Sequence, residues 1–273
     1  MKILSRSWPK LRVSALASLA SIFFLSCEEV LQLDLSDIEN QIVIEGVVSN
    51  SPSASVIRIG LTQSSFERSQ PGSISGARVT LSDDLGNSEV VNESQPGVFI
   101  PSVIAGVPGR VYNLSVEFLG REYSASSRMP APMSLDTITY EISSSWFTYG
   151  STSLKYYLTD KAGVEEYCLI KAYSQSSSSF VWTIYSDKYT DGKNVVLESP
   201  EFNPTDNAIV VEVIALDKSA YEYFYSLREI IGNTISIPDL LRMSDYNPKS
   251  NLTNNALGYF SAQATNRYVV KIR

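Results

Sequence analysis

From Gln41 onward, apolar and polar residues alternate with a period of two in short runs. The clearest runs of the first half are residues 42–45, 57–61, 79–81 and 112–118. Between them lie turn signals rich in Pro, Gly, Asn and Asp, at residues 50–52, 70–72, 83–87 and 95–97. Short alternating strands separated by turns are typical of an antiparallel β-sandwich. The pattern therefore predicts a first β-domain over residues 41–132, which ends where two prolines interrupt residues 129–132.

The second half, residues 133–273, continues with strand-like runs but is much richer in aromatic residues. It holds 14 of the 16 tyrosines, together with Trp146 and Trp182. Its strand-like runs are residues 135–142, 154–158, 166–173, 180–185 and 209–216, followed by two final strands within 254–262 and 267–272. We therefore predict a second, β-sandwich-like domain, and a mainly β protein overall.

One segment of the second half has helical rather than alternating periodicity, and it predicts a helix over residues 219–231. Ser219 and Glu222 have the spacing of a capping box, with Ser219 at the N-cap and Glu222 three positions later. One face of this helix is apolar, and Gly232 is a natural stop. The residues of that face are Ala220, Phe224, Leu227 and Ile231, with Tyr223 and Ile230 beside them. We expect this face to pack against the second sheet.

The first 26 residues have the composition of a secretory signal peptide. They contain four basic residues and no acidic ones, and residues 13–25 form an apolar run too short to cross a bilayer comfortably. This run ends at Leu25-Ser26-Cys27, which resembles a bacterial lipobox, although Phe24 stands where Leu is commonest. The resemblance implies cleavage before Cys27 and acylation of that cysteine. The alternatives are an ordinary signal peptide with a chance cysteine, or a buried N-terminal helix.

Residues 27–40 form a short acidic tether between the lipidated cysteine and the first strand. Glu28 and Glu29 directly after Cys27 resemble the export signal that sends lipoproteins of Bacteroidota to the cell surface, whereas the plain alternative is a solvated linker. We expect the protein to be anchored in outer-membrane lipid through acylated Cys27, on the extracellular face.

Charge and residue usage exclude several function classes. The chain has a net charge of −7, and removal of the four basic residues of the signal lowers it to −11, which argues against nucleic-acid binding. Histidine is absent, so a Ser-His-Asp triad and an imidazole zinc site are excluded. With Cys27 lipidated, Cys168 has no intramolecular partner, and its apolar neighbours predict a buried residue rather than a reactive thiol.

Two resemblances to known families arise from these residues. Residues 76–81, 96–99 and 109–116 resemble the immunoglobulin-like module of prealbumin and of carboxypeptidase regulatory domains. Nearly the whole mature chain resembles the DUF4249 lipoproteins of Bacteroidota. The segments that carry this second resemblance are residues 160–163 with Glu166-Tyr167, residues 220–227, residues 247–251 and residues 257–260. That resemblance implies genes beside TonB-dependent outer-membrane transporters, and it implies no catalytic residue.

The candidate chemistry lies in aromatic residues and in pairs of carboxylates. Trp146 and Tyr149, in a turn-rich stretch, are our candidates for ligand contact, although aromatic packing in a core competes with that interpretation. Trp182 and Tyr185 point to opposite sides of one strand, so part of this set must face a core. Asp83 with Asp84 is interpreted as a solvated turn rather than a calcium site, and the adjacent Glu165 and Glu166 cannot converge easily.

The sequence therefore favours a non-enzymatic function, with no cofactor, no metal ion and no catalytic residue. We expect an accessory subunit, either a lid or a substrate-capture component, of a TonB-dependent β-barrel transporter or a similar outer-membrane complex. An extended exposed apolar and aromatic surface would favour this function. The alternative is a stand-alone structural or adhesion module at the cell surface. A third possibility, a carboxylate hydrolase, requires two acids with raised pKa values in a cleft.

Overall fold

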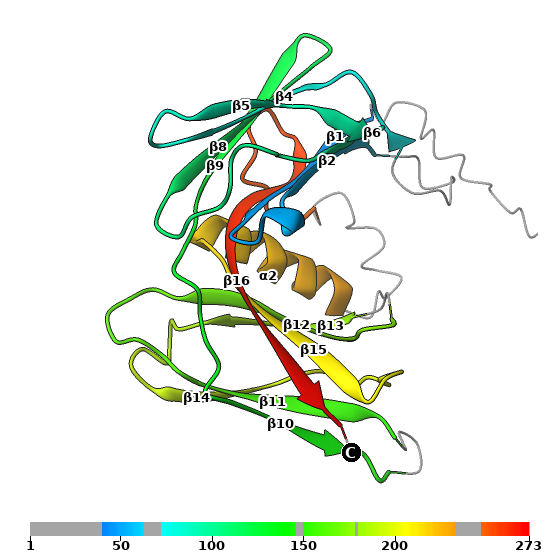
Figure 1. The fold of residues 1–273 in the computed structure, drawn as a ribbon, viewed down its shortest axis with the longest axis vertical. Coiled ribbons are helices and arrows are strands. Elements are labelled where there is room, and N and C mark those ends of the chain that lie inside the picture. The colour runs from blue at the N-terminus through cyan, green and yellow to red at the C-terminus, as the bar shows by residue number, and fades with distance from the viewer. Residues whose placement is uncertain (1–39, 63–71, 146–149, 178–179, 233–246, 273) are drawn as a thin grey trace, which may run out of the picture. The chain divides into compact units, whose positions relative to one another are not determined.

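The alternation that begins near Gln41 forms strand β1 (Ile42–Ser49), in which Ile42, Ile44 and Val48 are buried. The computed structural model describes residues 40–62, 72–145, 150–177, 180–232 and 247–272. Within this part of the chain the structure is mainly β, as predicted, with one α-helix (Figure 1). Residues Asn40–Arg273 form one compact unit.

Each of the four alternating runs predicted in the first half lies in a strand, and the described residues of that half contain five further strands. After β1 the elements are the 3-10 helix η2 (Pro52–Ala54), β2 (Val56–Leu61), β3 (Gly72–Ser73), β4 (Arg78–Asp83), β5 (Ser88–Val91), β6 (Glu93–Gln95), β7 (Val98–Phe99), β8 (Val111–Phe118) and β9 (Arg121–Arg128). The second half contains β10 (Thr137–Ile142), β11 (Thr152–Thr159), β12 (Tyr167–Ser174), β13 (Phe180–Ser186), β14 (Asn194–Glu198), β15 (Ala208–Ala215), α2 (Lys218–Gly232) and β16 (Leu257–Lys271).

These strands form three sheets. A nine-stranded sheet has the order β13-β12-β15-β16-β1-β2-β7-β6, with β3 also paired to β2. Two smaller sheets have the orders β5-β4-β8-β9 and β10-β11-β14. The first half thus contributes strands to two sheets whose buried residues belong to one core, which is the arrangement expected of a β-sandwich.

Strand β16 joins the two halves of the chain. Its first part, up to Gln263, pairs in parallel with β1, and its second part, from Ala264, pairs antiparallel with β15. The prediction of two separate final strands is therefore wrong, because residues 257–271 continue without a break from one partner to the next. The strand pairing also crosses the boundary predicted at residues 132 and 133, since the last strand of the chain completes the sheet begun by the first.

Two local features place the start of β16 against β1. Gly258 has a φ of +93°, and a Cβ atom there would lie 2.1 Å from the carbonyl oxygen of Ile44, so only glycine fits. The side-chain amide of Asn251 donates to the carbonyl of Phe260 at 2.8 Å and accepts from its N–H at 2.9 Å. Asn251 thereby acts as a strand partner for a residue of β16 that faces the core.

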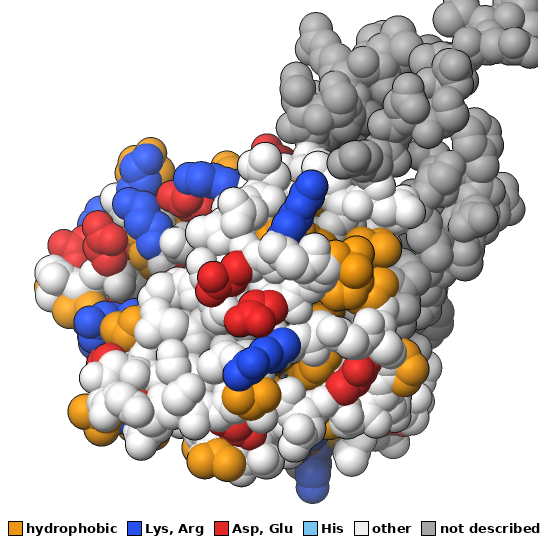
Figure 2. All heavy atoms as spheres, turned by 90° about the horizontal axis from the view of Figure 1, so that it is seen from above, with side chains coloured by type: hydrophobic (Ala, Val, Ile, Leu, Met, Phe, Trp, Pro, Cys, Tyr) orange, Lys and Arg blue, Asp and Glu red, His pale blue; other side chains and the backbone are white. Residues whose placement is uncertain are grey.

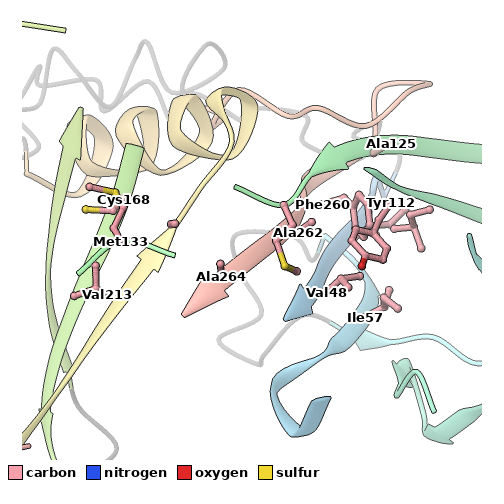
Figure 3. Close-up of a cluster of buried hydrophobic side chains, with 14 of the residues drawn as sticks. Val48, Ile57, Tyr112, Ala125, Met133, Cys168, Val213, Phe260, Ala262 and Ala264 are labelled. Carbon is pink, nitrogen blue, oxygen red and sulfur yellow. The ribbon is translucent and has the colours of Figure 1, made fainter. Parts of the chain in front are cut away.

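The core runs along β16 from one half to the other. Figure 3 shows Phe260 and Ala262 beside Tyr112 and Val48, with Met133, Cys168 and Val213 farther along, past Ala264. All of these side chains belong to one connected cluster of buried hydrophobic residues. Cys168 is fully buried on β12, as predicted, and burial raises the pKa of its thiol, which keeps it protonated.

The sandwich of the first half contains a tyrosine corner. The hydroxyl of Tyr112, near the start of β8, accepts a hydrogen bond from the N–H of Val107 at 2.7 Å and donates one to the carbonyl of Ala105 at 3.0 Å. Tyr112 is 1% exposed, so these two bonds satisfy a hydroxyl that has no access to water. Such a corner fixes the loop before a strand in Greek-key sandwiches.

A buried carboxylate holds the neighbouring loop. The Glu89 side chain, on β5, accepts from the N–H groups of Ser102, Val103 and Ile104 and from the Ser102 hydroxyl, at 2.7 to 3.0 Å. Burial alone would raise the pKa of Glu89, but the donors of Ser102, Ile104 and Val103 together outweigh it and lower the pKa from its ordinary 4.5.

This arrangement predicts that Glu89→Gln destabilises the protein by about 2–3 kcal/mol at neutral pH, because hydrogen bonds to a charged acceptor are lost. A lowered folded-state pKa gives stability that is present above the unfolded pKa and lost as the pH falls through the folded pKa. The gap between wild type and variant, measured by urea unfolding, should therefore shrink as the pH falls below 4.5. A gap that stays constant down to pH 3 would contradict this role of the charge.

Candidate functional site

A groove of about 820 Å³ lies between three segments of the second half. One wall is the start of α2, the second is the segment that leads into β12, and the third is the segment after β13. The lining residues are Gly163, Val164, Glu165, Tyr167, Ser186, Asp187, Lys188, Tyr189, Asp191, Lys218, Tyr221, Glu222 and Tyr225. A groove of this size fits a small molecule or a short stretch of polymer.

Three tyrosines follow one another from the start of β12 onto helix α2. The rings of Tyr167 and Tyr221 have centroids 4.8 Å apart, and those of Tyr221 and Tyr225 are 5.8 Å apart, each pair tilted by about 35°. Helical geometry explains the second pair, since residues four apart lie on the same face of a helix. We call Tyr167, Tyr221 and Tyr225 the tyrosine row.

A fourth tyrosine lines the groove from the segment after β13. Tyr189 is 78% exposed, and the ammonium of Lys188 lies 5.2 Å from the centre of its ring. In the tyrosine row, Tyr225 is 41% exposed, and the Arg228 guanidinium lies 5.0 Å from its ring. Both tyrosines therefore offer their rings to groups outside the core.

The polar end of the row is set by Tyr167. Its hydroxyl donates to the Glu165 carboxylate at 3.1 Å. Burial and this carboxylate raise the pKa of Tyr167 to about 12, so the phenol stays neutral and remains a donor under physiological conditions. The row thus presents aromatic faces with a carboxylate beside them.

Three aspartates lie together beside the groove, and two of them, Asp187 and Asp191, line it. Oxygen atoms of Asp160, Asp187 and Asp191 lie within 4.8 Å of one another, and the first two residues are buried. These are the side chains that could hold a cation here. Each is already engaged: Asp160 accepts from Gly192 N–H at 2.7 Å and from the Tyr185 hydroxyl, Asp187 from Glu166 N–H, and Asp191 from Gly163 N–H. These hydrogen bonds give the three aspartates a structural role, which is to hold two loops in place.

Helix α2 is placed by a buried network at its N-terminus. Its cap is Asp217, whose carboxylate accepts from the N–H of Ala220 at 2.8 Å, so the predicted cap at Ser219 is wrong. Ser219 lies within the first turn and is exposed. The other oxygen of Asp217 accepts from the Ser127 hydroxyl, which in turn accepts from Ala262 N–H on β16. Burial raises the pKa of Asp217, against the effect of these donors.

The apolar face of α2 packs against the sheet as predicted. Ala220 is fully buried and Phe224 packs against the cluster of Leu169, Ile184, Ile214 and Leu216. Tyr223 and Phe224 also contact the ring of Tyr259 on β16, with centroids 4.6 and 4.9 Å apart. Two of the three tyrosines of the row, Tyr221 and Tyr225, thus lie on a helix that is packed against the sheet.

The structure places the predicted site residues in different environments. Trp146 and Tyr149 lie outside the described residues. Trp182 is half-buried against the cluster beneath α2, and Tyr185, 5% exposed, faces the core on the opposite side of β13. Asp83 and Asp84 form ion pairs with Arg110, and Asp83 also accepts hydrogen bonds from Leu85 and Asn87 within the turn. Glu165 lines the groove and Glu166 does not.

The tyrosine row was not predicted from the sequence. The spacing of Tyr221 and Tyr225 was a usable signal, because it predicts one face of the helix. Tyr167 and Tyr189 gave no such signal, since they reach the groove from segments far away in the sequence. The row does include residues of two segments that carried the family resemblance, Glu166-Tyr167 and 220–227.

A family model described as "Domain of unknown function (DUF4249)" matches residues 28–268. The chain belongs to the DUF4249 family. The groove and the whole of α2 lie inside the matched range.

A solved structure, the two fibronectin type III domain segment from chicken tenascin, is similar at 10% identity, covering 65% of this DUF4249 chain and 91% of its own, with a TM-score of 0.22. The search of curated proteins gave no match. Among the described residues, no helix has the length and apolar character needed to span a membrane.

The cap network predicts unequal effects of two neighbouring substitutions. Asp217→Ala should cost about 2–3 kcal/mol of stability, because Ala220 N–H and the buried Ser127 hydroxyl lose their acceptor. Ser219→Ala should change stability by less than about 0.5 kcal/mol, as an exposed position does. Asp217→Asn, which keeps an acceptor oxygen, should lie between them. Urea unfolding midpoints measure all three, and equal effects at positions 217 and 219 would disprove the assignment of the cap.

Proposed function

We propose that this protein is a non-enzymatic outer-membrane lipoprotein that captures a ligand for a TonB-dependent β-barrel transporter. The observation that carries this proposal is the groove beside α2, which is lined by the tyrosine row and by a fourth tyrosine, Tyr189. Tyrosines supply large apolar faces with a polar end and few rotatable bonds, which suits the binding of a ligand in water.

The state of the acids in the groove favours binding over catalysis. A hydrolase that works through carboxylates needs two of them in the cleft, one with a raised pKa. Among the described residues, the carboxyl group with a raised pKa is that of Asp217, which is half-buried at the start of α2 and does not line the groove. Asp187 and Asp191, which do line it, accept backbone hydrogen bonds that hold the loops.

The proposed location rests on the N-terminal segment, which lies outside the described residues. An apolar run that ends at Cys27 supports lipidation of that cysteine. The acidic residues after Cys27 support export of the lipoprotein to the cell surface, as in Bacteroidota. Several acyl chains on one residue anchor a protein stably without any transmembrane segment. The tether, residues 27–40, then separates β1 from the lipid.

The proposal that the partner is a transporter rests on the family resemblance and on the net charge of the protein. A net charge of −11 after signal cleavage would repel an acidic outer surface, so adhesion by charge alone is disfavoured. Figure 2 looks onto the end of the molecule where β4 and β5 lie, and it shows apolar side chains in small separate groups among charges of both signs. The described residues visible on that face form no extended apolar surface for a barrel, so we expect a transporter to contact another face.

The proposal predicts that the native lipoprotein co-purifies with a β-barrel transporter from outer membranes solubilised in mild detergent. An interface of apolar and aromatic contacts should survive both low and high salt, whereas one held by charge dissociates as salt rises. Mass spectrometry identifies the retained proteins and the acyl groups on Cys27. Cys27→Ser should lack the acyl mass and leave the outer-membrane fraction.

Two results would overturn the proposal. Recovery of only the free lipoprotein at every salt concentration, at native expression level, would favour a stand-alone surface or adhesion module. The absence of acyl groups on Cys27 of the wild-type protein would contradict the proposed location in the outer membrane.

A further inference from the structure

We propose that the groove binds a positively charged ligand, one that presents alkylammonium or guanidinium groups to the tyrosines. This inference rests on the proposed function, since it names the class of ligand captured at the same groove. Two features carry it: the charge of the lining, and the aromatic faces, two of which already have a cation of the chain beside them.

The lining has an excess of negative charge. Four acids line the groove, Glu165, Asp187, Asp191 and Glu222, against the two lysines Lys188 and Lys218. The charged neighbours of the lining are Asp160, Lys249 paired with Glu222, Arg228 paired with Glu229, and Lys193, whose ammonium donates to the carbonyl of Tyr189. Including these five residues leaves an excess of one negative charge. Asp187 is buried, and a charge with little water around it is screened less than one at the surface.

The aromatic faces add attraction for the same kind of ligand. The face of a tyrosine ring carries negative electrostatic potential and attracts a cation placed over it. Tyr189 and Tyr225 each show this, with Lys188 and Arg228 at 5.2 and 5.0 Å from the ring centres. Because Tyr189 is 78% exposed, the ring face that Lys188 does not cover is open to a ligand.

Ligands of other charge fit the groove less well. An anion would face the excess negative charge of the lining. A neutral sugar could stack on the tyrosines and form hydrogen bonds with the carboxylates. A cation would bind the same carboxylates more strongly, because its donors are charged. A cation therefore uses both the rings and the acids.

The test is calorimetric titration of the mature lipoprotein in a non-ionic detergent. The probes are N-acetylated pentalysine amide, pentaglutamate of matched length, spermidine and maltopentaose. We expect pentalysine to bind, with an affinity that falls as salt rises, and we expect pentaglutamate and maltopentaose not to bind. Spermidine as tight as pentalysine would identify free polyamines, rather than cationic peptides, as the source of the charged group.

Paired variants separate the groove from the general charge of the protein. Tyr225→Ala should weaken pentalysine by about two- to five-fold, the effect of one exposed cation–π contact. Glu165→Gln should weaken it by a factor of about two to five, as for a partly screened ion pair. The matched controls are Phe180→Ala, at an aromatic residue 53% exposed on β13, and Glu117→Gln, at an exposed acid on β8. Neither control should change the affinity.

Three results would overturn the inference. Equal weakening by Glu165→Gln and Glu117→Gln would mean that only the overall charge attracts pentalysine. Binding of maltopentaose that Tyr225→Ala weakens would change the ligand class while leaving the groove as the capture site. Failure of every probe to bind would contradict the inference that the groove takes a cationic ligand. The proposed function would still be tested separately, by co-purification of the transporter.

Discussion

The pairing of β16 with both β1 and β15 is the constraint on which the rest of the structure depends. A strand near the C-terminus can lie parallel to the first strand only if it approaches the β1 backbone closely, and Gly258 permits this approach. Asn251 then satisfies the backbone of Phe260, whose ring fills the core between the two sheets of the first half. One continuous strand thus carries the hydrogen-bonded sheet, and the core beside it, across both halves.

The groove depends on the same strand. The side chains of β16 that face away from this core meet α2, where the ring of Tyr259 contacts Tyr223 and Phe224. The N–H of Ala262 completes the network that runs through Ser127 to the cap at Asp217. The helix that presents Tyr221 and Tyr225 is therefore fixed at its start by a buried hydrogen-bond network and along its length by aromatic packing. A rigid helix holds its side chains for binding better than a loop does.

Period-two alternation predicted most strands, because alternation reports directly which side of a strand is buried. It failed at the end of the chain, where residues 257–264 are half-buried or buried on both sides, as in a strand covered on two faces, and the alternation disappears. The cap was misplaced for a different reason. Asp217 and Ser219 are both good capping residues, and only the contact with Ser127 on β9, distant in sequence, distinguishes them.

The residues of the groove are still harder to predict from local sequence patterns. Its helical tyrosines follow from a spacing of four residues, but Tyr167, Tyr189 and the three clustered aspartates come together only when β12, β13 and the loops around them fold. Such a site has no local pattern. Two of the segments that carried the family resemblance meet there, whereas the segments at residues 247–251 and 257–260 serve the start of β16.

The most direct test of this account asks whether β16 makes the two halves one cooperative unit. In the mature chain, tryptophan emission comes from Trp146 and Trp182, both in the second half, whereas Leu114 is buried in the core of the first half on β8. Leu114→Ala should cost about 2–5 kcal/mol. The account predicts that urea unfolding followed by tryptophan emission and by far-ultraviolet circular dichroism shifts to lower urea as a single coincident transition. A tryptophan transition that stays at the wild-type midpoint, while part of the dichroism is lost earlier, would contradict it.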